Sequence, residues 1–172
     1  MDDLRTRPLA TFDFRAPGRD PVADAEEVHT RLASVLAALP DEVWARELTA
    51  SDVSGAPAWT LRDHIGHVAD WDDEAVRYAS EVVAGSGDWP TDDDYGDMDA
   101  WNESRRGRWA GRTPAEMRAL YDAASAALVD VARRLPRDMA ASDEAWVWLF
   151  SLLSEHAIEH VQVLGEDVTA GA

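Results

Sequence analysis

The sequence predicts an all-α protein: a four-helix bundle with a short extra helix and an N-terminal arm. Four long segments repeat apolar residues every three or four positions, as one buried helix face requires. No segment shows the strict alternation of a half-buried strand. A chain of 172 residues suits one compact domain. We expect that domain over residues 22–168, after a flexible arm (1–21) and before a short tail (169–172).

The first two predicted helices cover residues 22–39 and 60–84. Pro40 ends the first helix because proline cannot continue an α-helix. The second begins at a capping box in which Thr60 and Asp63 cap each other's backbone amides, and it stops before Gly85. Its expected core face is apolar and consists of Leu61, Ile65, Val68, Val76 and Val83.

The remaining helices are expected at residues 99–108, 113–135 and 143–164. The longer middle helix has Thr113 as N-cap, Pro114 in its first turn and Glu116 completing a capping box. Gly165 ends the last helix. The acidic segment 88–99 precedes the short helix. It fails the ligand pattern of an EF-hand at three positions, so we interpret it as a solvated loop, with a place at a pocket mouth as the alternative.

Composition excludes several classes of function. The chain has no cysteine, and all 16 of its basic residues are arginine, so thiolate nucleophiles, Cys-type zinc sites and Schiff-base lysines are absent. A net charge of −18 argues against nucleic acid and anionic membrane surfaces as partners. The N-terminus lacks the pattern of a signal peptide, so we expect a cytoplasmic protein.

His156 and His160 are the first candidates for chemistry. Their spacing stacks both imidazoles on one helix face, shared with Leu149, Leu152 and Val163. Two polar rings on an apolar face need partners, and a metal ion would satisfy both. The string also matches the H-x-x-E-H motif of inverted zinc proteases. Because only 12 residues follow His160, a third ligand has to come from upstream, and the protease reading is disfavoured.

His67 is the best upstream candidate for a third ligand. It lies on the flank of the second predicted helix, on a side shared with Asp63, Trp71, Glu74 and Tyr78. Three imidazoles with an open position would resemble a catalytic metal site. The alternative is that all three rings are ordinary core histidines, hydrogen-bonded to carboxylates without a metal.

The other polar candidates have less defined roles. We expect His64 at the surface, although a place behind a ligand or as an alternative ligand stays open. Asp63 and Glu159 are candidates for a base or for support of the ligands. His29 has no evident partner in the sequence and receives no role.

Several motifs together resemble a known family. They are Trp59-Thr60-Leu61-Arg62-Asp63, Gly66-His67-Val68-Ala69-Asp70-Trp71, Met98-Asp99-Ala100-Trp101-Asn102-Glu103, Thr113-Pro114-Ala115-Glu116 and the pair His156-x-x-x-His160. Their order and spacing are similar to those of the DinB/YfiT-like metal-binding four-helix bundles, and the middle motifs resemble the ClbS/DfsB-like branch. The resemblance spans roughly residues 22–164.

The resemblance implies a divalent metal, zinc or nickel, held by His67, His156 and His160, and a homodimer. Activities in such a family include transfer and isomerisation that depend on mycothiol or bacillithiol, and hydrolysis of a reactive toxin. The thiol-dependent isomerases often have Glu where this chain has His156, and an apolar residue is commoner where it has His64.

These observations lead to two competing hypotheses of function. The first is a metal-dependent transferase or hydrolase that acts on a small electrophilic substrate, in detoxification or resistance. Such an enzyme could use a low-molecular-weight thiol as cofactor. The second is a non-catalytic bundle that binds a ligand or in which a structural metal pins the helices together.

Overall fold

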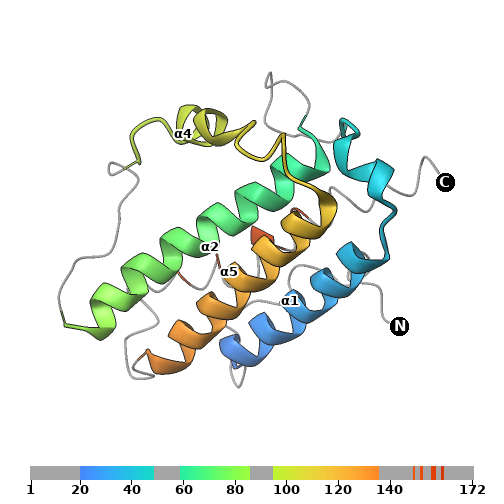
Figure 1. Ribbon diagram of the computed structural model, residues 1–172. Coiled ribbons are helices and arrows are strands. Elements are labelled where there is room, and N and C mark those ends of the chain that lie inside the picture. Colours follow the sequence, from blue (N-terminus) through green and yellow to red (C-terminus); the bar gives the residue numbers. More distant parts are fainter. Residues whose placement is uncertain are drawn as a thin grey trace.

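The structure, a computed structural model, describes residues 20–48, 59–85 and 95–135, together with Leu149, Leu152, His156, Ala157 and His160. These ranges form helices α1 (Pro21–Ala38), α2 (Leu61–Val83), α4 (Met98–Arg105) and α5 (Pro114–Arg134), and the 3-10 helix η3 (Asp41–Ala45) (Figure 1). They contain no β-strand, and the predicted all-α bundle is confirmed. None of these helices is long and apolar enough to span a membrane.

Three predicted segments lie largely or wholly outside the described residues. They are the N-terminal arm up to residue 19, the acidic loop up to residue 94 and the tail at 169–172. Of the predicted last helix, the five residues named above are described, and all five have helical backbone. The domain boundaries therefore stay predictions.

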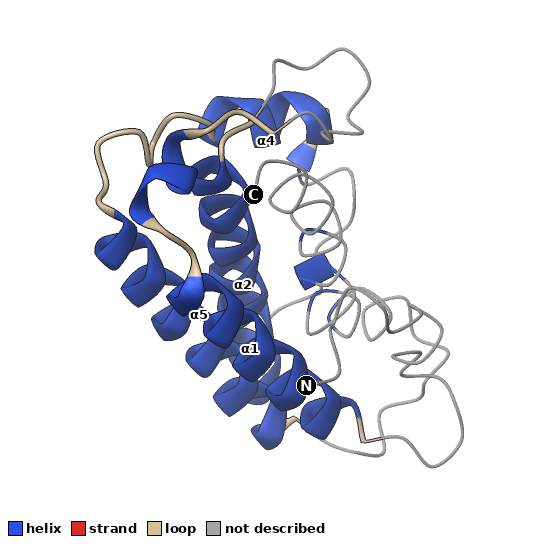
Figure 2. Cartoon of the chain, turned by 90° about the vertical axis from the view of Figure 1, so that its right-hand side faces the viewer, coloured by secondary structure: helices blue, strands red, loops and turns tan. Residues whose placement is uncertain are grey.

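Helices α1, α2 and α5 lie side by side, with α5 between the other two (Figures 1 and 2). Helices α2 and α5 run in the same direction, and α1 runs in the opposite one (Figure 1). Because α2 and α5 are parallel, the chain between them has to run back along the bundle. Helix α4 is part of this connection and lies alongside α2 (Figure 1).

Local capping explains where the long helices begin. Asp20 accepts a hydrogen bond from the backbone amide of Val22 (3.1 Å) at the start of α1. At α2, the Thr60 amide donates to Asp63 Oδ2 (2.9 Å), and the Asp63 amide donates to Thr60 Oγ1 (3.3 Å). The capping box of Thr113 and Glu116 at α5 is complete. These predicted helix starts are confirmed.

The core face of α2 differs from the predicted one toward its C-terminus. Val83 is 40% exposed, and Val76 is only partly buried. The buried face instead continues from Val68 through Asp72, Ala75 and Ala79. Those positions follow the helical period and lie on one side of α2, whereas Val76 and Val83 lie toward a different side of the helix. The small alanines let neighbouring helices approach closely.

Helix η3 was not predicted, because the sequence there has no helical periodicity. Its Trp44 is fully buried in the core with Leu32, Leu36 and Leu48. The Leu48 amide then donates to the Trp59 carbonyl (2.9 Å), which fixes the chain just before α2 begins.

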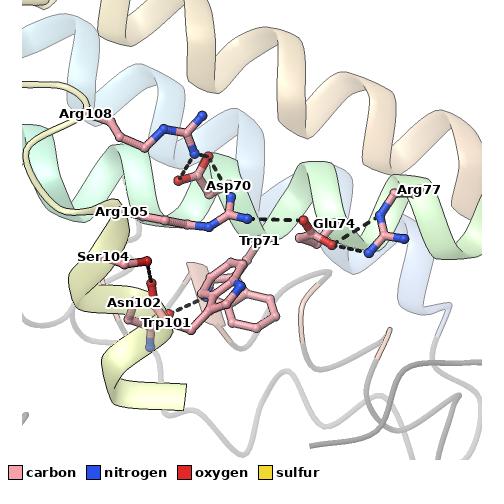
Figure 3. Close-up of polar contacts among 9 residues, drawn as sticks. All are labelled: Asp70, Trp71, Glu74, Arg77, Trp101, Asn102, Ser104, Arg105 and Arg108. Atoms are coloured by element: carbon pink, nitrogen blue, oxygen red, sulfur yellow. Dashed lines mark hydrogen bonds and ion pairs between the residues drawn. The ribbon is translucent and has the colours of Figure 1, made fainter. Parts of the chain in front are cut away.

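Ion pairs, a hydrogen bond and a ring contact hold α4 and the turn after it against α2. Arg108 Nη1 lies 3.1 and 3.2 Å from the two carboxylate oxygens of Asp70, and Arg105 pairs with Glu74 (3.5 Å) (Figure 3). The indole of Trp71 donates to Asn102 (3.2 Å), and its ring packs at a tilt against that of Trp101, with ring centres 4.5 Å apart (Figure 3). The α4 segment is thereby placed over the side of α2 that carries Trp71.

Candidate metal centre

Three histidine side chains from two distant parts of the chain meet beside α2. His156 Nε2 lies 3.1 Å from His67 Nε2 and 3.2 Å from His160 Nε2. One nitrogen from each ring can be chosen so that all three lie within 4.8 Å of one another. The structure thus brings together the three histidines singled out in the sequence.

The two shortest printed separations between these nitrogens match those of ligands that share one divalent ion. Metal–imidazole bonds are about 2.0–2.1 Å long, so two ligands of one ion lie about 2.9–3.4 Å apart, from octahedral to tetrahedral angles. Both Nε2 separations fall within that interval. Within the described residues, no other group of three such side chains has this spacing.

Helix geometry explains how the rings converge. His156 and His160 are one turn apart on helical backbone, so both side chains point the same way. His67 leaves α2 from the flank of its buried face, next to Trp71. Two indoles flank it: the Trp59 and Trp71 ring centres lie 5.1 and 6.4 Å from that of His67, both edge-to-face.

Burial keeps all three imidazoles neutral. It lowers the pKa of His67 to about 2, with smaller contributions from His156 and His64, and it lowers the pKa of His156 to about 4. Burial, together with the neighbouring histidines, also holds the pKa of His160 well below its usual range. Neutral imidazole is the form that binds metals, so no proton has to leave these rings at neutral pH.

The family model for the DinB superfamily matches residues 24–164 of the chain, which is most of its length. The chain belongs to the DinB superfamily. No curated protein and no solved structure matches it significantly. Proteins of the DinB superfamily typically bind a divalent metal, and the His67, His156 and His160 group is where this member could hold one. The ClbS/DfsB-like branch stays a prediction.

One residue of this DinB-superfamily protein differs from expectation. His64 was expected at the surface, but it is only 4% exposed. Its Nδ1 lies 3.0 Å from His160 Nδ1, on the opposite side of the His160 ring from Nε2. The expectation failed because helix periodicity puts His64 beside His67, and that side of α2 faces the segment carrying His160 rather than solvent. The three-residue spacing of His64 and His67, which places both on one side of the helix, was the sequence pattern that indicated the burial of His64.

The remaining predicted site residues are less directly connected with the imidazoles. The Asp63 carboxylate accepts hydrogen bonds from Thr60 and from the Gly107 amide (3.2 Å), so its described role is to cap α2 and hold the turn after α4. Glu159 lies outside the described residues. His29 is buried in α1, and its Nδ1 contacts the Tyr121 hydroxyl (2.6 Å).

Proposed function

We propose that this DinB-superfamily protein is a divalent-metal-dependent enzyme whose ion is held by His67, His156 and His160. The observation that carries the proposal is the convergence of three neutral Nε2 atoms at 3.1 and 3.2 Å. These nitrogens come from positions 89 residues apart in the sequence, so chain proximity alone does not account for their meeting.

Three neutral ligands leave a bound divalent ion its charge, and such an ion acts as a Lewis acid that makes a thiol or water a better nucleophile near neutral pH. The protein's own residues orient the rings and exclude water from them. Trp59 packs against His67 and His64, and Trp71 packs against His67. These indoles supply an apolar wall next to the three nitrogens.

We propose a small electrophilic molecule as substrate, attacked by a thiol or by water in a detoxification or resistance reaction. The chain has no cysteine, so a sulfur nucleophile has to come from a low-molecular-weight thiol such as mycothiol or bacillithiol. Zinc or nickel suits an all-imidazole ligand set. A homodimer without nucleic-acid or membrane partners completes the proposal, and light scattering of the purified protein measures its mass.

Metal content provides the first test. We expect purified protein, or protein reconstituted with Zn²⁺ or Ni²⁺, to hold one ion per chain and to melt at a higher temperature than metal-free protein. His160→Ala should abolish stoichiometric binding. His29→Ala is the matched control, because it removes another buried helical histidine that contacts Tyr121 rather than the imidazole group. Wild-type protein that binds no ion would remove the basis of the proposal.

Catalysis provides the second test. Reconstituted protein is incubated with a thiol and an electrophilic dye such as monochlorobimane, and product formation is followed by fluorescence. We expect a rate above the uncatalysed reaction that disappears in His160→Ala and persists in His29→Ala. Hydrolysis of the electrophile without thiol is measured in parallel, because it separates the two reaction types.

A structural metal is the competing function, and one observation favours it: the ligands join α2 to a segment near the end of the sequence, so an ion would pin the two together. A purely structural ion predicts that the metal-loaded wild type has a higher melting temperature than the metal-free protein but catalyses neither reaction of the second test. Catalysis by the metal-loaded wild type excludes a purely structural ion.

A further inference from the structure

His64 contacts the candidate metal site from behind one of its ligands. It is one turn before His67 on α2, and it is 4% exposed. Its Nδ1 lies 3.0 Å from Nδ1 of His160, and the two ring centres are 5.2 Å apart. The Nε2 of the same His160 ring lies 3.2 Å from His156 Nε2. His160 thus has one nitrogen toward His64 and the other toward the proposed ligands.

The single proton of each neutral imidazole restricts how the rings of His64 and His160 can hydrogen-bond. A neutral imidazole carries one N–H, so each ring has one donor and one acceptor nitrogen. If His160 Nδ1–H donates to His64 Nδ1, then His160 Nε2 keeps its lone pair and can bind an ion. If the bond runs the other way, the proton of His160 sits on Nε2 and blocks binding there. One direction of this hydrogen bond therefore matches a ligand at Nε2.

We infer that His64 is a positioning residue that holds His160 in the tautomer and orientation needed to bind the metal through Nε2. The inference rests on the proposed metal site. Ligand histidines generally donate their second N–H to a carboxylate, a carbonyl or water, and here a second imidazole supplies the acceptor.

The other proposed ligand on that segment lacks such support among the described residues. His156 Nδ1 is buried and has no hydrogen-bond partner there. The orientation of His160 is therefore the better defined of the two, and removing His64 should affect the site through His160. Loss of the His64 side chain should therefore weaken metal binding through His160, although His64 is itself no proposed ligand.

Two variants at position 64 separate a positioning role from simple packing. His64→Asn places an amide oxygen near the position of Nδ1 and keeps an acceptor for His160, whereas His64→Leu fills similar space without one. His29→Leu is the matched control, since it removes a buried histidine of α1 that contacts Tyr121. Zn²⁺ affinity is measured by competition with a chromophoric chelator, and the stability of each metal-free protein by thermal unfolding.

We expect His64→Leu to bind Zn²⁺ about 10- to 100-fold more weakly than wild type, as is typical when the support of a ligand is removed. His64→Asn should stay within about threefold of wild type because it restores the acceptor. Metal-free His64→Leu should melt no lower than the metal-free wild type, since it removes a polar ring from a buried position. His29→Leu should keep its affinity.

The outcomes distinguish failure of this inference from failure of the proposed function. Wild-type protein that binds no Zn²⁺ overturns both. Wild-type binding with unchanged affinity in His64→Leu overturns the inference alone. Equal losses in His64→Leu and His64→Asn also overturn it, because they indicate packing rather than acceptance of a hydrogen bond. Binding of a second ion that is lost in both variants would instead make His64 a ligand and overturn its positioning role.

Discussion

Asp72 of α2 is a carboxylic acid in the middle of the bundle core. It is fully buried, and neither of its oxygens has a hydrogen-bond partner among the residues that the structure describes. Burial raises its pKa well above the usual range, and the charge of neighbouring Asp73 raises it further. Asp72 therefore keeps its proton to a higher pH in the folded protein than in the unfolded chain.

This difference makes stability depend on pH. Below about pH 4 both states carry the proton and the cost is absent. As pH rises above that value, only the unfolded chain releases its proton, so stability falls until the folded-state pKa is reached. Asp72→Asn removes the titration and should stabilise the protein at pH 7, with a gain that vanishes near pH 4.

Thermal unfolding of Asp72→Asn and wild type between pH 4 and pH 8 measures this effect. Asp122→Asn is the control, because Asp122 is exposed on α5 and should change stability by less than about 0.5 kcal/mol. A destabilised Asp72→Asn variant at neutral pH would contradict the expectation, since it would show that the folded protein uses the charge.

The histidines show what sequence patterns can and cannot predict for single residues. Helical spacing placed His156 and His160 on one face, and the position of His67 on the flank of the second predicted helix made it the upstream candidate. The structure brings these three side chains together. The burial of Asp72 was not predictable in the same way, and that of His64 was indicated only by its spacing from His67. It depends on which neighbour covers each side of α2, and this is decided by packing of the whole chain.

At the scale of helices, the docking of the α4 segment depends on Gly66. A Cβ atom at this position would lie 2.1 Å from Nε1 of Trp109, whose ring packs directly on the α2 backbone. Trp109 is 7% exposed and belongs to the core. Gly66 is therefore required by a close contact, although glycine weakens a helix interior.

Gly66→Ala tests this contact. Alanine improves helix propensity by about 1 kcal/mol, but the overlap with Trp109 should outweigh this gain, and we expect a net loss of about 1–3 kcal/mol. Gly111→Ala is the control, because among the described residues, its chain neighbours aside, no atom lies within 4 Å of its Cβ position. Urea unfolding of both variants gives the two values. A Gly66→Ala variant as stable as wild type would show that the packing of Trp109 does not require glycine at position 66.

Elements with local signals were predictable, and elements with distant partners were not. The starts of α2 and α5 were found because Thr60 and Thr113 bind carboxylates three residues away in the sequence. The 3-10 helix η3 and the contact of Trp109 with Gly66 depend on residues far apart in the chain. No local pattern reports such contacts.

At the scale of the whole molecule, electrostatic repulsion is the dominant surface property. The chain has 34 acidic and 16 basic residues, so many carboxylates have no basic partner even if every arginine is paired. Surface ion pairs such as Arg118 with Asp41 (3.2 Å) are partly or largely exposed and contribute little. Repulsion among like charges destabilises the compact state.

Added salt should therefore stabilise the protein. Raising NaCl from about 0.01 M to 0.1 M shortens the Debye length from about 30 to 10 Å, which screens repulsion across the surface. We expect a gain on the order of 1 kcal/mol, seen as a melting temperature about 2–4 °C higher. The measurement uses metal-free protein and is repeated with KCl to exclude a specific ion effect. A lower melting temperature in salt would show that the ion pairs outweigh the repulsion.

The two indoles beside His67 have an experimental consequence. Of the eight tryptophans in the chain, Trp59 and Trp71 have ring centres 5.1 and 6.4 Å from that of His67. A paramagnetic ion such as Ni²⁺ bound at this site would lie close enough to both to quench their fluorescence. The protein thus contains an optical reporter of its own candidate site, and occupancy can be titrated on unlabelled protein.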